Sequence, residues 1–270
     1  MLRSAKELQG YSIYATDGEA VGDVEAFFFD DESWKVRYLV AKAGGLLVNR
    51  EVLIAPEFVE SVDRDVRTLY TGLTRKQVEN SPGVEADRPV ADQQEIAYYD
   101  HYGVPPYWGN GWEPATGAAG PAYTGAYLPT PGFVLEPEAG ETVYERRGDP
   151  HLRSTREVAG YHIGATDGET GHVEDFIVDG EDWAIRYVVV DTRNWLPGRK
   201  VLVSPRWIPG VSWRRREVYV NLTRDEIKSA PEWDPDAPLD REYETRLYEH
   251  YGRPPYWVYH QQDSTEERTQ

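Results

Sequence analysis

Two stretches of this chain are near copies of each other. Residues 4–30 read SAKELQGYSIYATDGEAVGDVEAFFFD, and residues 154–179 read STREVAGYHIGATDGETGHVEDFIVD. The correspondence runs to the end of each copy, where HYGVPPYW at 101–108 returns as HYGRPPYW at 250–257. A long internal repeat of this kind indicates one structural unit that is present twice.

The repeat divides the chain into four parts. Residues 1–108 and 151–257 are the two copies, 109–150 is a Gly/Pro/Ala-rich linker, and 258–270 is a polar tail. The linker is too polar and too often interrupted by Pro to form a core of its own. Two interpretations remain open for it: an extended tether, or a strap whose aromatic side chains dock onto a domain or a partner. Those side chains are Trp112, Tyr123, Tyr127 and Phe133.

Each copy shows several short strands with helices beside them. Asp-Gly at 17–18 and at 167–168 favours a tight hairpin, because Gly adopts positive φ at low cost. Ser/Thr followed three residues later by Glu/Gln predicts helix starts at Ser4, Ser154, Thr74 and Thr223. Longer helices are expected near Asp92 and Asp240, each ended by a Pro-Pro pair. The expected strands are 24–29, 36–41, 51–54 and 67–71, then 173–178, 185–190, 200–203 and 217–221. Short strands at this spacing favour a small barrel or sandwich.

The order of these motifs resembles the PRC-barrel family. The pattern is Ser-x-x-Glu-Leu-x-Gly-Tyr, then Asp-Gly-Glu, Val-Gly-x-Val-Glu and Trp-x-Val-Arg-Tyr-Leu-Val, matching best at 2–72 and again at 152–221. The family includes the cytoplasmic domain of the photosynthetic reaction-centre H subunit and many small bacterial proteins. The resemblance implies a mainly β chain of two small antiparallel β-barrels with short flanking helices, joined by the linker. It implies a role in assembly and no catalytic residues.

Composition excludes several classes of protein. The net charge of −18 argues against non-specific nucleic-acid binding and against adhesion to an anionic membrane surface. The absence of Cys excludes disulfides and thiolate metal sites. No apolar run is long enough for a membrane span, and the first residues do not resemble a signal peptide. We therefore expect a cytoplasmic protein.

The sequence offers little that suggests catalysis. We find no phosphate loop, no nucleophile elbow and no HExxH motif. His101 and His250 occupy equivalent positions, and we expect them to bond free carbonyls at a helix end rather than to act in catalysis. A metal site formed by His162, His172 and Glu174 is a weaker hypothesis, because the first copy has no such cluster. We predict no enzyme activity, no cofactor and no resident metal.

The most informative difference between the copies is their charge. Residues 1–108 carry 11 basic and 19 acidic side chains, whereas 151–257 carry 15 and 19. The added bases gather beside Trp in two loops of the second copy, a combination typical of interfaces. The first copy offers apolar residues in one of those loops. The predicted partner-binding residues are Arg193, Trp195, Arg199, Lys200, Trp213, Arg214, Arg215, Arg216, Leu46, Leu47 and Val48. Two solvated loops remain the alternative.

We therefore expect a protein-binding or assembly module with two differently charged docking surfaces. The basic patch of the second copy would meet an acidic protein face or lipid headgroups, and the first copy would offer its apolar loop. The family resemblance implies one specific version, a bacterial peripheral subunit on the cytoplasmic side of the inner membrane, bound to a photosynthetic reaction-centre-like complex. The alternatives are a cytosolic stress-related protein, or a small-molecule-binding protein or enzyme that uses a cleft between the barrels.

Overall fold

The computed structural model describes residues 1–43, 50–84, 92–104, 151–192 and 198–258. The elements of the first repeat are β1 (Leu2–Ser4), α1 (Ala5–Leu8), β2 (Ser12–Tyr14), β3 (Ala20–Asp30), β4 (Lys35–Ala43), β5 (Arg50–Ile54), η1 (Pro56–Phe58), β6 (Val59–Asp63), β7 (Thr68–Thr71), α2 (Arg75–Glu79), β8 (Gly83–Val84) and α3 (Asp92–Tyr102).

The second repeat follows the same element order, except that no strand corresponds to β8 among its described residues. Its elements are β9 (Leu152–Ser154), α4 (Thr155–Val158), β10 (His162–Ala165), β11 (Gly168–Asp179), β12 (Ile185–Asp191), β13 (Lys200–Val203), η2 (Pro205–Trp207), β14 (Gly210–Ser212), β15 (Glu217–Tyr219), α5 (Arg224–Ser229) and α6 (Arg241–Tyr251). The eight expected strands are present, several of them longer than predicted.

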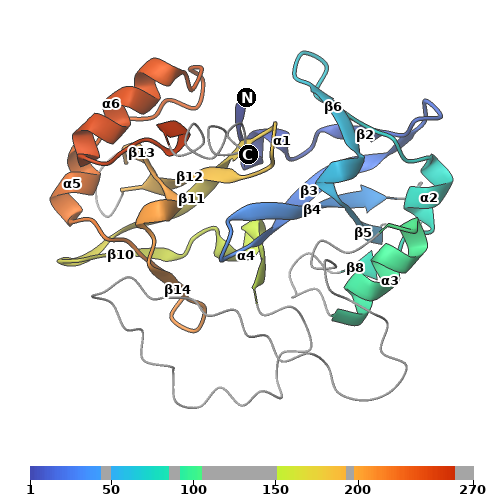
Figure 1. The fold of residues 1–270 in the computed structure, drawn as a ribbon, viewed down its shortest axis with the longest axis horizontal. Coiled ribbons are helices and arrows are strands. Elements are labelled where there is room, and N and C mark those ends of the chain that lie inside the picture. The colour runs from blue at the N-terminus through green and yellow to red at the C-terminus, as the bar shows by residue number, and fades with distance from the viewer. Residues whose placement is uncertain (44–49, 85–91, 105–150, 193–197, 259–270) are drawn as a thin grey trace, which may run out of the picture.

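The two repeats build one sheet each, and the sheets lie side by side (Figure 1). The first runs β6-β7-β2-β3-β4-β5-β8, and the second runs β14-β15-β10-β11-β12-β13. The fold is mainly β, as predicted. The expectation of purely antiparallel pairing was wrong at one place in each sheet, since β2–β7 and β10–β15 are parallel. The hairpin β6–β7 meets β2 through its second strand, which runs in the same direction as β2.

Neither sheet closes into a barrel through the strand pairings of the described residues, which differs from the expected architecture. A returning segment occupies the edge that closure would need. In the first sheet β8 pairs with β5, and in the second an isolated bridge joins Val201 to Glu232. The strand that follows β5 is also separated from it by η1, which begins with Pro56.

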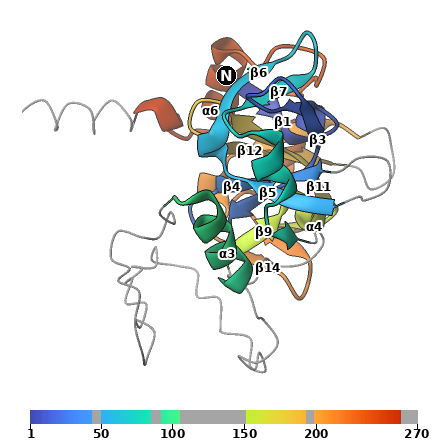
Figure 2. The same cartoon turned by 90° about the vertical axis from the view of Figure 1, so that its right-hand side faces the viewer.

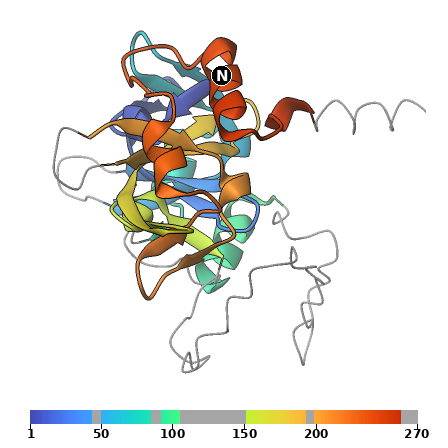
Figure 3. The ribbon, with the colours of Figure 1, turned by 90° about the vertical axis from the view of Figure 1, so that its left-hand side faces the viewer.

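The helices cap and cover the sheets as the sequence predicts. Thr74 and Thr223 both form complete capping boxes at the starts of α2 and α5. Ser4 caps α1 through the amide of Glu7. The longer helices α3 and α6 lie at opposite ends of the molecule in Figure 1, so that α3 faces the viewer in Figure 2 and α6 faces the viewer in Figure 3. α6 ends at Gly252, which has φ of 59° and precedes the Pro-Pro pair.

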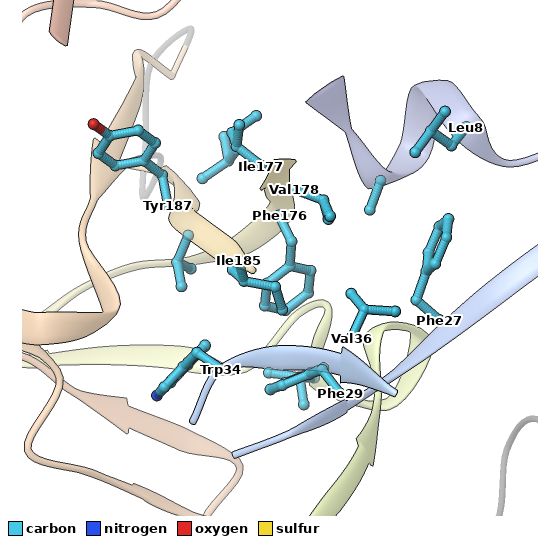
Figure 4. Packing of buried hydrophobic residues seen from close by; sticks show 14 of the residues in the cluster. Leu8, Phe27, Phe29, Trp34, Val36, Phe176, Ile177, Val178, Ile185 and Tyr187 are labelled. Atoms are coloured by element: carbon cyan, nitrogen blue, oxygen red, sulfur yellow. The ribbon is translucent and has the colours of Figure 1, made fainter. Parts of the chain in front are cut away.

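The two repeats share a continuous hydrophobic core. The Phe29 and Phe176 rings, one from each repeat, lie 5.4 Å apart. Figure 4 shows them between the sheets, with Val36 from the first repeat and Ile185 from the second nearby. Burial of such large side chains is the main driving force for folding. The repeats are therefore parts of one packed body over the described residues.

Candidate docking surface and inter-repeat cleft

The basic turn between β14 and β15 holds four of the predicted partner-binding residues. Arg214, Arg215 and Arg216 are exposed there, whereas Trp213 is half-buried. The turn is tight because Arg216 adopts φ of 53°, an uncommon conformation for a residue other than Gly. Arg215 donates to the Tyr219 hydroxyl at 3.2 Å, which fixes one side of the turn.

Trp213 anchors this turn to the rest of the protein. Its ring lies 3.9 Å from the guanidinium carbon of Arg153 and 5.9 Å from the Tyr161 ring. Arg153 lies on β9, is only 3% exposed and forms an ion pair with Asp31 of the first repeat at 3.3 Å. Burial raises the pKa of the Asp31 carboxyl, although Arg153 acts in the opposite direction. The turn is thus supported by a charge pair between the repeats.

The equivalent turn of the first repeat is different. Arg64 takes the position of Trp213, and its Nε lies 3.0 Å from the Glu7 carboxylate. Arg67 lies over the Tyr11 ring at 5.0 Å, as Arg216 lies over Tyr161 at 5.3 Å. The first turn therefore presents a mixture of charges, while the second presents consecutive arginines.

The remaining predicted partner-binding residues do not join this turn. Arg199 donates to the carbonyls of Lys228 and Ala230 and pairs with Glu232, so it holds α5 and the segment after it. Lys200 pairs with Glu174 at 3.5 Å. Arg193, Trp195, Leu46, Leu47 and Val48 lie outside the described residues.

A polar cleft of about 520 Å³ lies where the repeats meet. Its lining includes Lys6 and Arg64 of the first repeat and Glu174, Asp175 and Lys200 of the second. Lys6 Nζ lies 2.8 Å from Glu174, which lowers the pKa of that carboxyl against the effect of burial. Burial raises the pKa of Asp175, whose carboxylate accepts from the Ser4 hydroxyl and the Lys6 amide. These charged groups thus bond to one another across the junction.

The histidines of the second repeat are close in space, but they are arranged differently from the hypothesis. His162 and His172 are cross-strand neighbours, yet His162 pairs with Glu169 at 3.0 Å. The group whose ligand atoms lie within 4.8 Å of one another is His172, Glu174 and Asp191. Neither His162 nor His172 lines the cleft.

Charge exchange between the copies accounts for this acidic group. In the first repeat, Lys42 stands opposite Glu51, and in the second, Asp191 stands opposite Lys200. The basic and the acidic residue of this cross-strand pair have therefore exchanged places, and the pair is still one basic residue opposite one acidic residue. Glu174 already has Lys6 and Lys200 within 3.5 Å, so a cation at this group would compete with two ammonium groups.

His101 and His250 occupy equivalent places and bond helix carbonyls, as expected. The Nε2 atom of His101 lies 2.8 Å from the Gln77 carbonyl in α2, and that of His250 lies 2.8 Å from the Glu226 carbonyl in α5. Each histidine thereby ties the long C-terminal helix of its repeat to the short helix before it.

Comparison with known families agrees with the first repeat. The family model described as PRC-barrel domain matches residues 2–74. Residues 2–74 are a PRC-barrel domain. The match to the PRC-barrel model does not extend to the second copy, whose likeness to the first rests on sequence and on the shared strand order. No curated protein matches the chain.

The PRC-barrel match identifies a domain and assigns it no partner, substrate or location. Among the described residues, no helix combines the length and the apolar character needed to cross a membrane.

Sequence reasoning missed the residues that bind the two repeats together. Asp31, Arg153 and Asp175 carry the inter-repeat contacts, but none belongs to a motif. A usable signal was present in the comparison of the copies, because Asp31 aligns with Gly180 and Asp175 aligns with Ala26. Charged residues that appear in only one copy of the repeat are candidates for asymmetric contacts.

Proposed function

We propose that this protein is a non-catalytic assembly module whose second repeat docks an acidic protein surface through the turn Trp213–Arg216. The observation that carries the proposal is the run of three exposed arginines beside an anchored tryptophan. Arg and Trp are enriched among residues that dominate binding energy at interfaces. The packing of Trp213 against Arg153 and Tyr161 presents the turn with little ordering cost on binding.

The charge of the whole chain adds to the part that this turn plays in orienting an acidic partner. With a net charge of −18, the chain as a whole repels acidic partners. A local basic turn then selects the orientation in which an acidic partner approaches, and it raises the association rate more than the final affinity.

The family resemblance adds a specific version of this function. The partner would be the cytoplasmic face of a membrane complex, with a photosynthetic reaction centre as the example that the family supplies. This version rests on analogy of fold, and the basic turn is compatible with any acidic protein face.

The test replaces Arg214 and Arg215 with Glu and leaves Arg216, which lies over Tyr161, unchanged. The matched control carries the same charge change elsewhere on the repeat, at Lys228 and Arg246, both of which are exposed. Tagged proteins are used to purify partners at low salt from the cells that produce the chain. We expect at least one protein to be captured by the wild type and the control and lost from the turn variant. Identical partners for all three proteins would contradict the proposal.

A second measurement tests whether the acidic surface that binds the turn belongs to a protein or to a lipid membrane. The wild type is sedimented with vesicles of phosphatidylserine and phosphatidylcholine at low salt. We expect no co-sedimentation, because the net charge of the chain opposes approach to an anionic surface. Sedimentation of the wild type that is lost in R214E/R215E would show that the turn binds anionic lipid headgroups, and these would take the place of an acidic protein as the proposed target.

A further inference from the structure

Each repeat contributes its first strand to the sheet of the other repeat. Strand β1 pairs antiparallel with β11, in the register Ser4 to Ile177, and β9 pairs with β3, in the register Ser154 to Phe28. These registers are equivalent under the repeat. In Figure 2, β9 is the yellow-green strand that lies beside the blue strands of the first sheet.

The exchanged strands fill edges that would otherwise be incomplete. One edge of β3 is covered by β4 along most of its length. On the other edge β2 reaches only from Ala20 to Asp23, and β9 covers Phe28 to Asp30. The second sheet repeats this arrangement, with β10 and β1 sharing one edge of β11. Backbone groups of each long strand therefore depend on the other repeat for their hydrogen bonds.

The repeats also meet around a two-fold pseudo-axis. Lys35 and Ala184 are equivalent residues, and they form an antiparallel bridge with each other. On either side, the Val36 amide donates to the Trp183 carbonyl at 2.9 Å and the Ile185 amide donates to the Trp34 carbonyl at 2.7 Å. A contact in which equivalent residues meet is the geometry of a symmetric dimer interface, here contained in one chain.

Polar contacts at the two exchanged segments are not equivalent. Near β1, the Asp175 carboxylate accepts from the Ser4 hydroxyl and from the Lys6 amide, the latter at 3.1 Å. The first repeat has Ala26 at the position of Asp175. A second copy of the first repeat in this place would therefore lack this acceptor for the Ser4 hydroxyl and the Lys6 amide.

Near β9, the selective contact is the ion pair between Arg153 and Asp31 at 3.3 Å. The second repeat has Gly180 at the position of Asp31. Two second repeats paired with each other would not offer Arg153 this carboxylate, and loss of a carboxylate beside a largely buried guanidinium is unfavourable. The contacts thus favour the pairing of a first repeat with a second repeat over either like pairing.

We propose that the face which each repeat turns toward the other is a selective repeat-pairing surface, which binds the complementary repeat in preference to a like repeat. The covalent connection raises the effective concentration of one repeat near the other. The pairing itself is carried by the exchanged strands, the shared core and the two selective contacts. When the linker 109–150 is cut, we expect the two repeats to remain bound to each other.

The experiment cuts the full-length protein after it has folded. A protease recognition sequence is inserted within 109–150, and an affinity tag is placed after Gln270, because the amino group of Met1 bonds Asp179. After cutting, we expect the two fragments to elute together in equal amounts at about 1 µM, a concentration well above a nanomolar dissociation constant. Separate elution of the fragments would overturn the proposal.

A second measurement tests association between different molecules. Cut tagged protein is mixed with cut, isotopically heavy, untagged protein, and the mixture is unfolded in urea and refolded. We expect the tagged fragment to capture light and heavy N-terminal fragments equally. The uncut chain refolded alongside shows whether the conditions permit folding. Recovery of the tagged fragment alone, while the uncut chain refolds, would overturn the proposal.

Selectivity is tested with Asp175→Ala, which introduces the residue that the first repeat has at this position. Loss of a carboxylate that accepts two hydrogen bonds is expected to speed fragment exchange about tenfold. Asp236→Ala is the matched control, since Asp236 is an exposed carboxylate beside the same cleft. Equal exchange rates in the wild type and both variants would contradict the selective role of Asp175.

Discussion

At the scale of single residues, Arg153 and Arg3 show how the copies have diverged. They are equivalent in sequence and lie on the equivalent exchanged strands β9 and β1. Arg153 lies between the carboxylate of Asp31 and the ring of Trp213. For Arg3, the Nη1 atom is buried and has no hydrogen-bond partner among the described residues. Arg153 therefore has a carboxylate contact across the interface and an aromatic contact that Arg3 does not show among the described residues.

This difference predicts that replacing Arg153 lowers the stability of the protein more than replacing Arg3. Arg153→Ala removes one ion-pair partner of the largely buried Asp31, another being His151, and it removes the support of Trp213. We therefore expect it to lower the free energy of unfolding by about 3 kcal/mol. Arg3→Ala is the matched control and should cost clearly less. Urea unfolding followed by Trp fluorescence measures both. Similar losses in the two variants would contradict the role given to the Asp31 contact.

At the scale of elements, a tyrosine and a glutamate connect the long helix of each repeat to its sheet. The Tyr38 hydroxyl donates to Glu95 of α3 at 2.7 Å, and the Tyr187 hydroxyl donates to Glu244 of α6 at the same distance. Both carboxyl groups are at least 97% buried. Burial raises the pKa of Glu244, and the hydrogen bond from Tyr187 opposes that rise.

We expect Tyr187→Phe to destabilise the protein by about 2 kcal/mol, because it leaves a buried carboxyl group with one donor fewer. Tyr38→Phe should have a similar effect through α3. Tyr70→Phe, whose residue is 38% exposed, serves as the control and should be nearly neutral. Thermal and urea denaturation measure the three variants. A neutral Tyr187→Phe would show that packing alone holds α6 on its sheet.

At the scale of the whole molecule, buried carboxyl groups at the junction of the repeats link stability to pH. Burial raises the pKa of Asp31 and of Asp175 above the ordinary value. The folded state therefore binds more protons than the unfolded state in the range between the two pKa values. The free energy of unfolding rises as pH falls through the folded-state pKa toward the unfolded value of about 3.9. Asp30 and Asp179 have lowered pKa values, so their contribution is lost when the pH falls further.

Asp175→Asn tests this link. The variant lacks one of the groups whose protonation stabilises the folded state, so its stability should rise less than that of the wild type as pH is lowered from about 7 to about 4. Urea midpoints at several pH values provide the measurement, with Asp236→Asn as a control that should follow the wild type. A constant difference between Asp175→Asn and the wild type at every pH would contradict the expected titration of Asp175.

The sequence by itself determined the repeat, the mainly β character, the capped helices and the position of the basic turn. These features depend on local pattern: turn residues such as Asp17 and Gly18, the capping box at Thr74, and alternation in the strands. The family resemblance at 2–72 agrees closely with the PRC-barrel match at 2–74. The short strands β1 and β9 were missed because three residues carry too little periodicity to predict a strand.

Only the tertiary structure decided how the two copies use each other. The exchange of β1 and β9, the bridge from Lys35 to Ala184 and the pair of Asp31 with Arg153 join residues that are more than 100 positions apart. No local pattern encodes such contacts, because they depend on which sheet edge is free once both copies have folded. The same reason explains why the sequence did not show that Arg199 bonds the Ala230 carbonyl or that Lys200 pairs with Glu174. A charged side chain in a loop has the same local sequence whether it bonds a neighbouring carbonyl or faces solvent.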